Sequence, residues 1–247
     1  MECYKDFAHI YDELINDDVN YKLWSEKIIS ICEKYNLSKR DYLDLACGTG
    51  NLTIEIGKSF ISTTAVDLSQ EMLTRAEEKL RENRLRFKMF CQNISMLKLR
   101  KSFDLITCGL DSTNYILNDE ELMNYFKGVY NHLKEDGIFI FDINSEYKLR
   151  NILGDNSFNY DNDEVVYIWE NEIEDDIVNM FLTFFVKEGQ VYRRFDEEHR
   201  ERIYSEKFLD ELLAKVGFEI YEKLDNYESN SLNEETERIV YILGKKS

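Results

Sequence analysis

The apolar residues of this chain follow two different rhythms. Residues 21–35 place apolar side chains three or four positions apart, which is typical of an amphipathic helix. From residue 41 onward, short apolar runs alternate with longer amphipathic segments, which predicts a parallel sheet with helices on both faces. The expected strands are 42–46, 62–66, 86–90, 103–108 and 137–142, and the expected helices start at 50 and cover 70–82 and 119–132.

Residues 163–204 interrupt this alternation. Three strand-like runs, at 165–169, 177–185 and 191–195, are separated by short polar turns. Runs joined by such turns pair as antiparallel hairpins. We therefore expect a small antiparallel β-cap here rather than another strand–helix–strand unit.

The end of the chain returns to the first pattern. A helix is expected at 205–216 and ends at Gly217, a residue that readily adopts the left-handed C-cap conformation. The strands 218–224 and 238–244 follow, separated by a polar stretch that we expect to be a surface loop. Proline is absent, so helix starts must be marked by Ser, Asp and Asn caps.

Together these patterns predict an α/β fold. Its main sheet has seven strands, and the β-cap is inserted after strand five. The expected division is a main domain of 1–150 and 205–247 with N-terminal helices at 4–36, and an inserted β-cap at 151–204.

Charge and cysteine content narrow the class of partner. The formal net charge of −18 would repel a polyanion, which disfavours a nucleic-acid substrate. No apolar stretch is long enough to span a membrane and no signal pattern is present, so we expect a cytoplasmic protein without a membrane partner. The five cysteines are scattered, which predicts free thiols and no metal site.

A glycine-rich turn follows the first predicted strand. Gly48 and Gly50 let the backbone turn sharply and approach a ligand, and the helix that begins there offers unpaired N–H groups. Asp67 ends the second predicted strand, 17 residues beyond Gly50, where a carboxylate can accept both hydroxyl groups of an adenosine ribose. Thr53 replaces the third glycine of the dinucleotide-binding motif, so a pyrophosphate would fit poorly.

Four segments resemble the successive motifs of class I S-adenosylmethionine-dependent methyltransferases. They are 43–50, 66–73, 103–106 and 133–137. Residues 7–12 followed by Tyr21 and Trp24, and the segments 111–115 and 198–202, resemble a bacterial small-molecule-type subgroup with a β-cap before the last helix. That subgroup is similar to sugar N-methyltransferases and glycine N-methyltransferase-like enzymes. The resemblance implies an enzyme that binds S-adenosyl-L-methionine and methylates a small-molecule acceptor. It also implies a Rossmann-like sheet that is parallel except for an antiparallel last strand, with the helices at 4–36 as a lid and the β-cap at 151–204 over the active site.

The resemblance also implies roles for single residues. The glycine turn would line the methionine part of the cofactor, Asp67 would bind the ribose, and the residues after it would touch the adenine. Asn93 stands where the family usually has Asp, although an amide oxygen can also accept a hydrogen bond from the adenine amino group. The implied cofactor-binding residues are Tyr11, Trp24, Ala46, Cys47, Gly48, Gly50, Asp67, Leu68, Met72, Asn93, Ile94 and Leu110.

Two of these residues have a competing interpretation. Tyr11 and Trp24 would close over the cofactor from the N-terminal helices, but the helical spacing of Trp24 fits a core position equally well. Cys47 has no neighbouring His to activate it, so a structural role is favoured over a nucleophilic one.

Two side chains are candidates for catalysis. Tyr115 follows strand four at the carboxyl end of the sheet, where open α/β folds bind ligands. The family fold would bring His199 over the methyl group, although a packing role is an equal alternative. Methyl transfer is an in-line displacement that positioning alone could support. An ammonium acceptor would need a base, for which Tyr115, His199 and Asp111 are candidates.

Two alternatives to a methyltransferase stay open at this point. A non-catalytic adenosyl-binding or partner-binding protein is compatible with the sequence, because no side chain is shown to be required for chemistry. An NAD-dependent oxidoreductase is disfavoured by Thr53. We expect a monomer or a homodimer.

Overall fold

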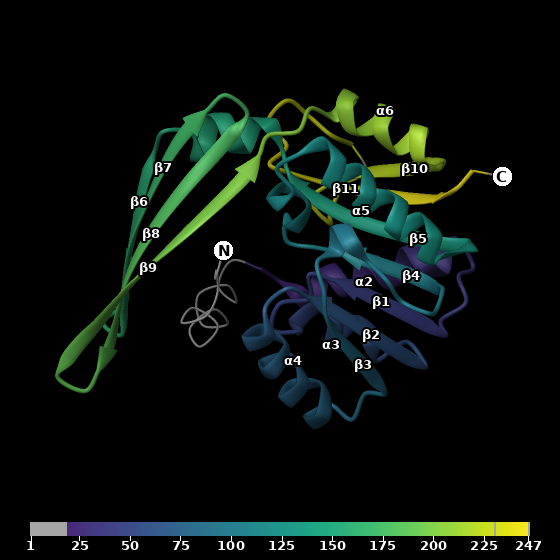
Figure 1. Ribbon diagram of the computed structural model, residues 1–247, viewed down its shortest axis with the longest axis horizontal. Helices are drawn as coiled ribbons and strands as arrows, with labels where there is room; N and C mark the ends of the chain where they lie inside the picture. The colour runs from purple at the N-terminus through teal and green to yellow at the C-terminus, as the bar shows by residue number, and fades with distance from the viewer. Residues whose placement is uncertain (1–18, 230, 247) are drawn as a thin grey trace.

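The computed structural model describes residues 19–229 and 231–246, and a seven-stranded sheet lies at its centre (Figure 1). The strand order is β10-β11-β5-β4-β1-β2-β3. Strands β1 to β5 run parallel, and β11 is antiparallel to both of its neighbours, which confirms the predicted sheet. The strands are β1 (Asp41–Leu45), β2 (Ser62–Asp67), β3 (Phe87–Cys91), β4 (Phe103–Cys108), β5 (Leu133–Asn144), β10 (Phe218–Asp225) and β11 (Arg238–Lys245).

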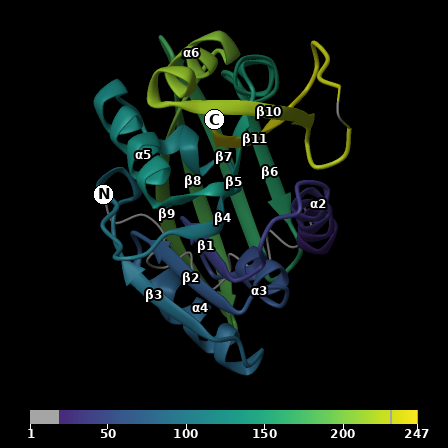
Figure 2. The same ribbon diagram turned by 90° about the vertical axis from the view of Figure 1, so that its right-hand side faces the viewer.

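Helices cover both faces of this sheet, as Figure 2 shows for α2 and α5. They are α2 (Tyr21–Lys34), α3 (Asn51–Gly57), α4 (Gln70–Glu82), α5 (Asp119–His132) and α6 (Glu206–Val216). The alternation of β1 divides the core, because Tyr42 packs with α2 and α3 whereas Leu43 and Leu45 pack with α5 and α6. Each layer therefore buries one set of alternating strand residues.

Polar side chains start the helices in the absence of proline. Asn20, Ser69, Asn118 and Ser205 each accept a hydrogen bond from a backbone N–H of the first turn of α2, α4, α5 and α6. Gly217 ends α6 with a φ of 113°, the left-handed C-cap expected from the sequence.

A second sheet lies between β5 and α6 in the sequence and projects from the main sheet (Figure 1). Its order is β6-β7-β8-β9, and each neighbouring pair is antiparallel. The strands are β6 (Ser157–Asp161), β7 (Val165–Glu174), β8 (Ile177–Glu188) and β9 (Val191–Arg202). A short helical turn, Lys148–Leu153, packs Leu149 and Leu153 against Val178 and Met180 of β8.

The structure corrects three details of the prediction. The second sheet has four strands rather than three. The pattern did not predict β6 because this strand is only five residues long and alternates aromatic with polar residues. Strand β9 continues to Arg202 rather than ending at 195, since its polar residues stay paired with β8. The loop between β10 and β11 is irregular as expected, but Tyr227 within it is only 2% exposed. Hydrophobic patterning does not detect polar strand residues that are buried by a neighbouring element.

No helix within residues 19–229 and 231–246 is long and apolar enough to cross a membrane.

Candidate active site

A cavity of about 540 Å³ opens at the carboxyl ends of β1 to β4. Its lining comes from 46–49 after β1, 67–72 at the end of β2, 92–95 after β3 and part of the loop after β4. This volume lies in the range of small-molecule and cofactor sites. The carboxyl edge of a parallel sheet is also where open α/β folds bind their ligands.

The turn after β1 leaves room for a ligand beside its backbone. Gly48 has a φ of 54°, and a Cβ built on it would meet no atom within 4 Å. Ala46, Cys47 and Gly48 line the cavity, as the sequence predicts. The open space at Gly48 is therefore where a bound molecule can approach the main chain.

Gly50 is held in the turn by close packing. It is not among the described residues that line the cavity. Its φ is 81°, and a Cβ at this position would lie 3.1 Å from the Cβ of Ala76. Gly50 thus allows the start of α3 to pack closely against α4.

Asp44 of β1 binds Thr53 of α3, the helix that follows the turn, and also lines the cavity. Its carboxylate accepts hydrogen bonds from the hydroxyl groups of Thr53, at 2.5 Å, and of Thr107, at 2.8 Å. Burial raises its pKa to about 6, although these hydroxyl groups oppose the shift. An acidic residue inside an apolar strand is a sequence signal for such a site, and the sequence reasoning did not assign it a role.

Asp67 lies beside the glycine turn. One carboxylate oxygen accepts the backbone N–H of Gly48 at 2.8 Å, and the other accepts that of Ser69 at 2.8 Å. Burial raises the pKa of this carboxyl, while the backbone N–H groups act in the opposite direction. Each carboxylate oxygen can accept a second hydrogen bond, so the ribose hydroxyl groups of the predicted cofactor fit this group.

The side chains predicted to touch the adenine also lie around the cavity. Leu68, Met72, Asn93 and Ile94 all line it. Leu68 is 66% exposed, which leaves a large apolar surface available to a flat ring. The side-chain oxygen of Asn93 accepts the backbone N–H of Ser95 at 2.8 Å and keeps a second acceptor position.

Of the two aromatic residues that the resemblance places over the cofactor, the structure describes only Trp24 of α2. Tyr11 lies outside the described residues. Trp24 is only 5% exposed and stacks on Tyr227 with ring centroids 4.3 Å apart, so it occupies a core position. Tyr21, three positions earlier on α2, lines the cavity instead.

The loop after β4 brings Leu110 and Tyr115 to the cavity. His199 of β9 is not among the described residues that line it, and neither is any other residue of β6 to β9. The rings of Tyr115 and His199 nevertheless meet edge to face, with centroids 6.0 Å apart. Burial lowers the pKa of His199 to about 4, although Asp111 opposes the shift, so this imidazole is neutral near pH 7.

Glu201 is a buried carboxyl that the sequence reasoning missed. It lies two positions beyond His199 on the same face of β9, is 3% exposed and accepts a hydrogen bond from the side-chain amide of Asn144 at 2.8 Å. Burial, together with the negative charge of Asp111, raises its pKa to about 8. The sequence does place Glu197, His199 and Glu201 at alternating positions, which in a strand share one face, and the structure buries all three.

The described cysteines carry free thiols. Burial raises the pKa of the Cys47 thiol well above its ordinary value, so the nucleophilic thiolate is disfavoured. Cys108 is buried, whereas Cys91 is exposed at the edge strand β3. Within residues 19–229 and 231–246, no three His, Cys, Asp or Glu residues group to hold a metal ion.

Comparison with known proteins decides the family. Residues 43–137 match the family model of a methyltransferase domain. A crystal structure of an S-adenosylmethionine-dependent methyltransferase from Clostridium acetobutylicum ATCC 824 is 54% identical, with a TM-score of 0.94 over 99% of both chains. The chain belongs to the class I S-adenosylmethionine-dependent methyltransferases. The predicted enzyme class and cofactor are thereby confirmed.

Other relatives of this methyltransferase agree in family or in fold. A protein of Geobacillus sp. (strain WCH70) that is named a methyltransferase is 32% identical over 251 residues, covering 98% of this chain and 99% of its own. The sugar N-methyltransferase KedS8 from Streptoalloteichus sp ATCC 53650 is 18% identical, with a TM-score of 0.78 over 96% of this chain and 93% of its own. At that identity the second comparison shows a shared fold.

Proposed function

We propose that this methyltransferase transfers a methyl group to a nitrogen or oxygen atom of a small molecule by in-line displacement. The observation that carries the proposal is the contact between Tyr115, which lines the cavity, and His199 of the second sheet. An acceptor held beside these rings would reach the cavity from the side of β6 to β9. The sheet β6 to β9 then serves as a cap over the active site, and residues 4–36 serve as its lid.

The cofactor would lie along the carboxyl edge of β1 to β3. The turn at Gly48 would hold its amino acid part, Asp67 its ribose, and Leu68, Met72 and Ile94 its adenine. Bound there, the sulfonium supplies an activated methyl group. The protein has to orient the acceptor and exclude water, and a well-aligned pair of reactants gains most of its rate from that orientation.

A protonated amine acceptor would also have to lose a proton to water before it attacks. His199 is a weak base because its pKa is about 4, so its role in the proposal is to orient the acceptor. Tyr115 would orient the acceptor through its hydroxyl group. Both residues are proposed to act on the acceptor rather than on the cofactor.

Two observations favour a small-molecule methyl acceptor over a macromolecular one. The net charge of −18 disfavours a polyanionic substrate such as RNA or DNA. KedS8, which shares this fold, is a sugar N-methyltransferase. The proposal includes a cytoplasmic enzyme that acts as a monomer or homodimer.

A panel of acceptors tests this function. Amino sugars, primary amines, hydroxylated aromatics and carboxylic acids, together with a protein and an RNA sample, are incubated with the full chain and the cofactor. Release of S-adenosylhomocysteine is measured, and mass spectrometry identifies the products. Methylation of one small-molecule class supports the proposal. Methylation of only protein or RNA would contradict it.

Three variants then test the acceptor residues. Tyr115→Phe and His199→Ala are expected to lower turnover at least 10-fold while S-adenosylhomocysteine affinity stays within about 2-fold. Tyr192→Phe is the matched control, because this hydroxyl donates to the Asp163 carbonyl at the far tip of the second sheet. Unchanged turnover in both Tyr115→Phe and His199→Ala would remove them from the mechanism.

A further inference from the structure

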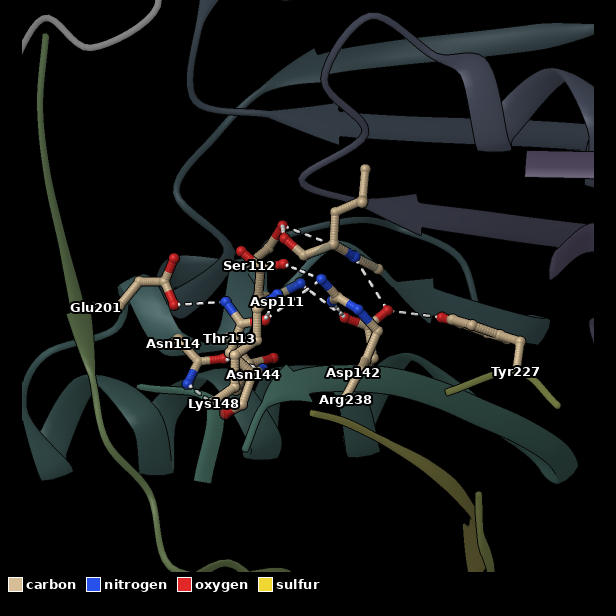
Figure 3. Close-up of polar contacts among 12 residues, drawn as sticks. Asp111, Ser112, Thr113, Asn114, Asp142, Asn144, Lys148, Glu201, Tyr227 and Arg238 are labelled. Carbon is tan, nitrogen blue, oxygen red and sulfur yellow. Dashed lines mark hydrogen bonds and ion pairs between the residues drawn. The ribbon is translucent and has the colours of Figure 1, made fainter. Parts of the chain in front are cut away.

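A buried ion-pair network lies beneath the loop that follows β4 (Figure 3). Arg238, the first residue of β11, bridges two carboxylates. One guanidinium nitrogen donates to Asp111 at 2.7 Å, and another donates to Asp142. The Arg238 side chain is 12% exposed and that of Asp142 is fully buried. Arg238, Asp111 and Asp142 come from three separate segments of the chain.

The same network fixes a strained turn that borders the cavity. Leu110 and Asp111 are consecutive residues with left-handed backbone, with φ values of 56° and 50°. Such residues each cost about 1 kcal/mol or more and need outside support. The Asp142 carboxylate accepts the backbone N–H groups of both, at 3.0 and 2.7 Å. Arg238 holds that carboxylate and the Asp111 side chain together.

Arg238 also contacts helix α2, which contributes a second part of the cavity lining. Its guanidinium carbon lies 5.4 Å from the ring centroid of Trp24 on α2. Trp24 stacks on Tyr227, whose hydroxyl group donates to Asp142 at 2.7 Å. Tyr21 of the same helix lines the cavity, as Leu110 does from the loop after β4. One buried guanidinium therefore connects both of these walls.

We propose that Arg238 is a positioning residue of the cofactor site, which holds the turn at Leu110 and Asp111 and the helix α2 against the cavity. Arg238 is not among the described residues that line the cavity, so it acts through these two walls. A buried ion pair rarely stabilises a fold more than apolar side chains of the same volume would. The bidentate reach of a guanidinium does fix two carboxylates at a set distance, which serves geometry.

Conservative variants test this role without emptying the core. Arg238→Lys keeps the charge but cannot form the two directed bonds. Asp111→Asn removes the ion pair alone, because Asn tolerates left-handed backbone. Lys245→Met is the matched control, since Lys245 is a cation at the opposite end of β11 and pairs with the exposed Glu135.

The first measurement is the affinity for S-adenosylhomocysteine by calorimetry. Arg238→Lys and Asp111→Asn are each expected to raise Kd about 10-fold, and Lys245→Met to leave it within about 2-fold. The double variant is expected to match a single one, because both changes break the same bridge. Multiplied effects in the double variant, or an unchanged Kd in Asp111→Asn, would overturn the proposal.

The second measurement separates positioning from stability. The chain has two tryptophans, so Trp169→Phe leaves Trp24 as the only fluorophore of that kind. Adding S-adenosylhomocysteine is expected to change Trp24 emission in this background. In Arg238→Lys this change in Trp24 emission should be lost at saturating S-adenosylhomocysteine. The melting temperatures of the two proteins, measured by circular dichroism, show whether the variant is also less stable. If Arg238→Lys kept the Trp24 emission change at full occupancy, the link between Arg238 and α2 would be overturned. If Arg238→Lys does not fold, the Kd of Asp111→Asn decides the proposal.

Discussion

The backbone N–H of Gly48 donates to the carboxylate of Asp67 across 2.8 Å. The turn after β1 and the acidic end of β2 therefore form one hydrogen-bonded unit. The bond orients the carboxylate beside the open space at Gly48. It also explains how an acidic side chain at the end of a second strand can act with a turn that lies 19 residues earlier in the sequence.

Asp67→Asn is expected to weaken S-adenosylhomocysteine binding by roughly 100-fold, because a hydrogen bond to a charged group contributes about 1.5–3 kcal/mol and the ribose offers two. Calorimetry measures the effect. Glu71→Gln is the control, since Glu71 is a second acid in the cavity lining without a predicted ribose contact. Equal losses in the two variants would point to general electrostatics rather than to a specific ribose contact.

Gly48→Ala is expected to lower cofactor affinity by about 10-fold or more, because its Cβ would enter the open side of the cavity. The stability change should be close to that of Gly189→Ala. Gly189 also has a positive φ, of 69°, and equally open surroundings, so it reports the backbone cost alone. If Gly48→Ala bound S-adenosylhomocysteine as tightly as the unmodified chain, the turn would not contact the ligand.

Gly50→Ala is expected to destabilise the fold by about 1–3 kcal/mol beyond Gly189→Ala, since its Cβ would press on Ala76 and Leu80 as well as strain the backbone. Thermal unfolding checks this in the absence of ligand. A melting temperature equal to that of Gly189→Ala would mean that α3 and α4 separate without cost.

The sequence predicted the parts of the site that depend on local order. The strand, the glycine turn and Asp67 follow each other within one strand–helix–strand unit, so spacing alone places them at one edge of the sheet. The same argument locates the loop after β4. Local patterning was sufficient because each of these residues is held by elements adjacent to it in the chain.

Long-range partners could not be predicted in this way. Trp24 and Tyr21 lie on the same helix, and only the packing of Tyr227, about 200 residues later, decides which of them faces the cavity. Arg238 pairs with carboxylates 96 and 127 residues away. Glu201 was missed because β9 is polar along its length and its burial depends on neighbouring elements.

Glu201 makes the stability of the protein depend on pH. Its pKa is about 8 in the folded chain against an ordinary value of 4.5. Between these values the folded state binds the proton more tightly than the unfolded state, so the contribution of Glu201 to the free energy of unfolding is largest below pH 4.5 and falls as pH rises towards 8. The slope approaches about 1.4 kcal/mol per pH unit. His199 acts in the opposite sense below pH 6.5, because its pKa is lowered by burial.

Glu201→Gln isolates this effect because it keeps an oxygen for the Asn144 amide and cannot ionise. Urea unfolding between pH 6.5 and 8 is expected to show the unmodified chain losing stability relative to Glu201→Gln as pH rises. Glu198→Gln, on the opposite and exposed face of β9, should keep the slope of the unmodified chain. Parallel pH profiles for the unmodified chain and Glu201→Gln would mean that this carboxyl is ionised at neutral pH, with its charge balanced by Lys148 and Arg238, the two cations that favour ionisation.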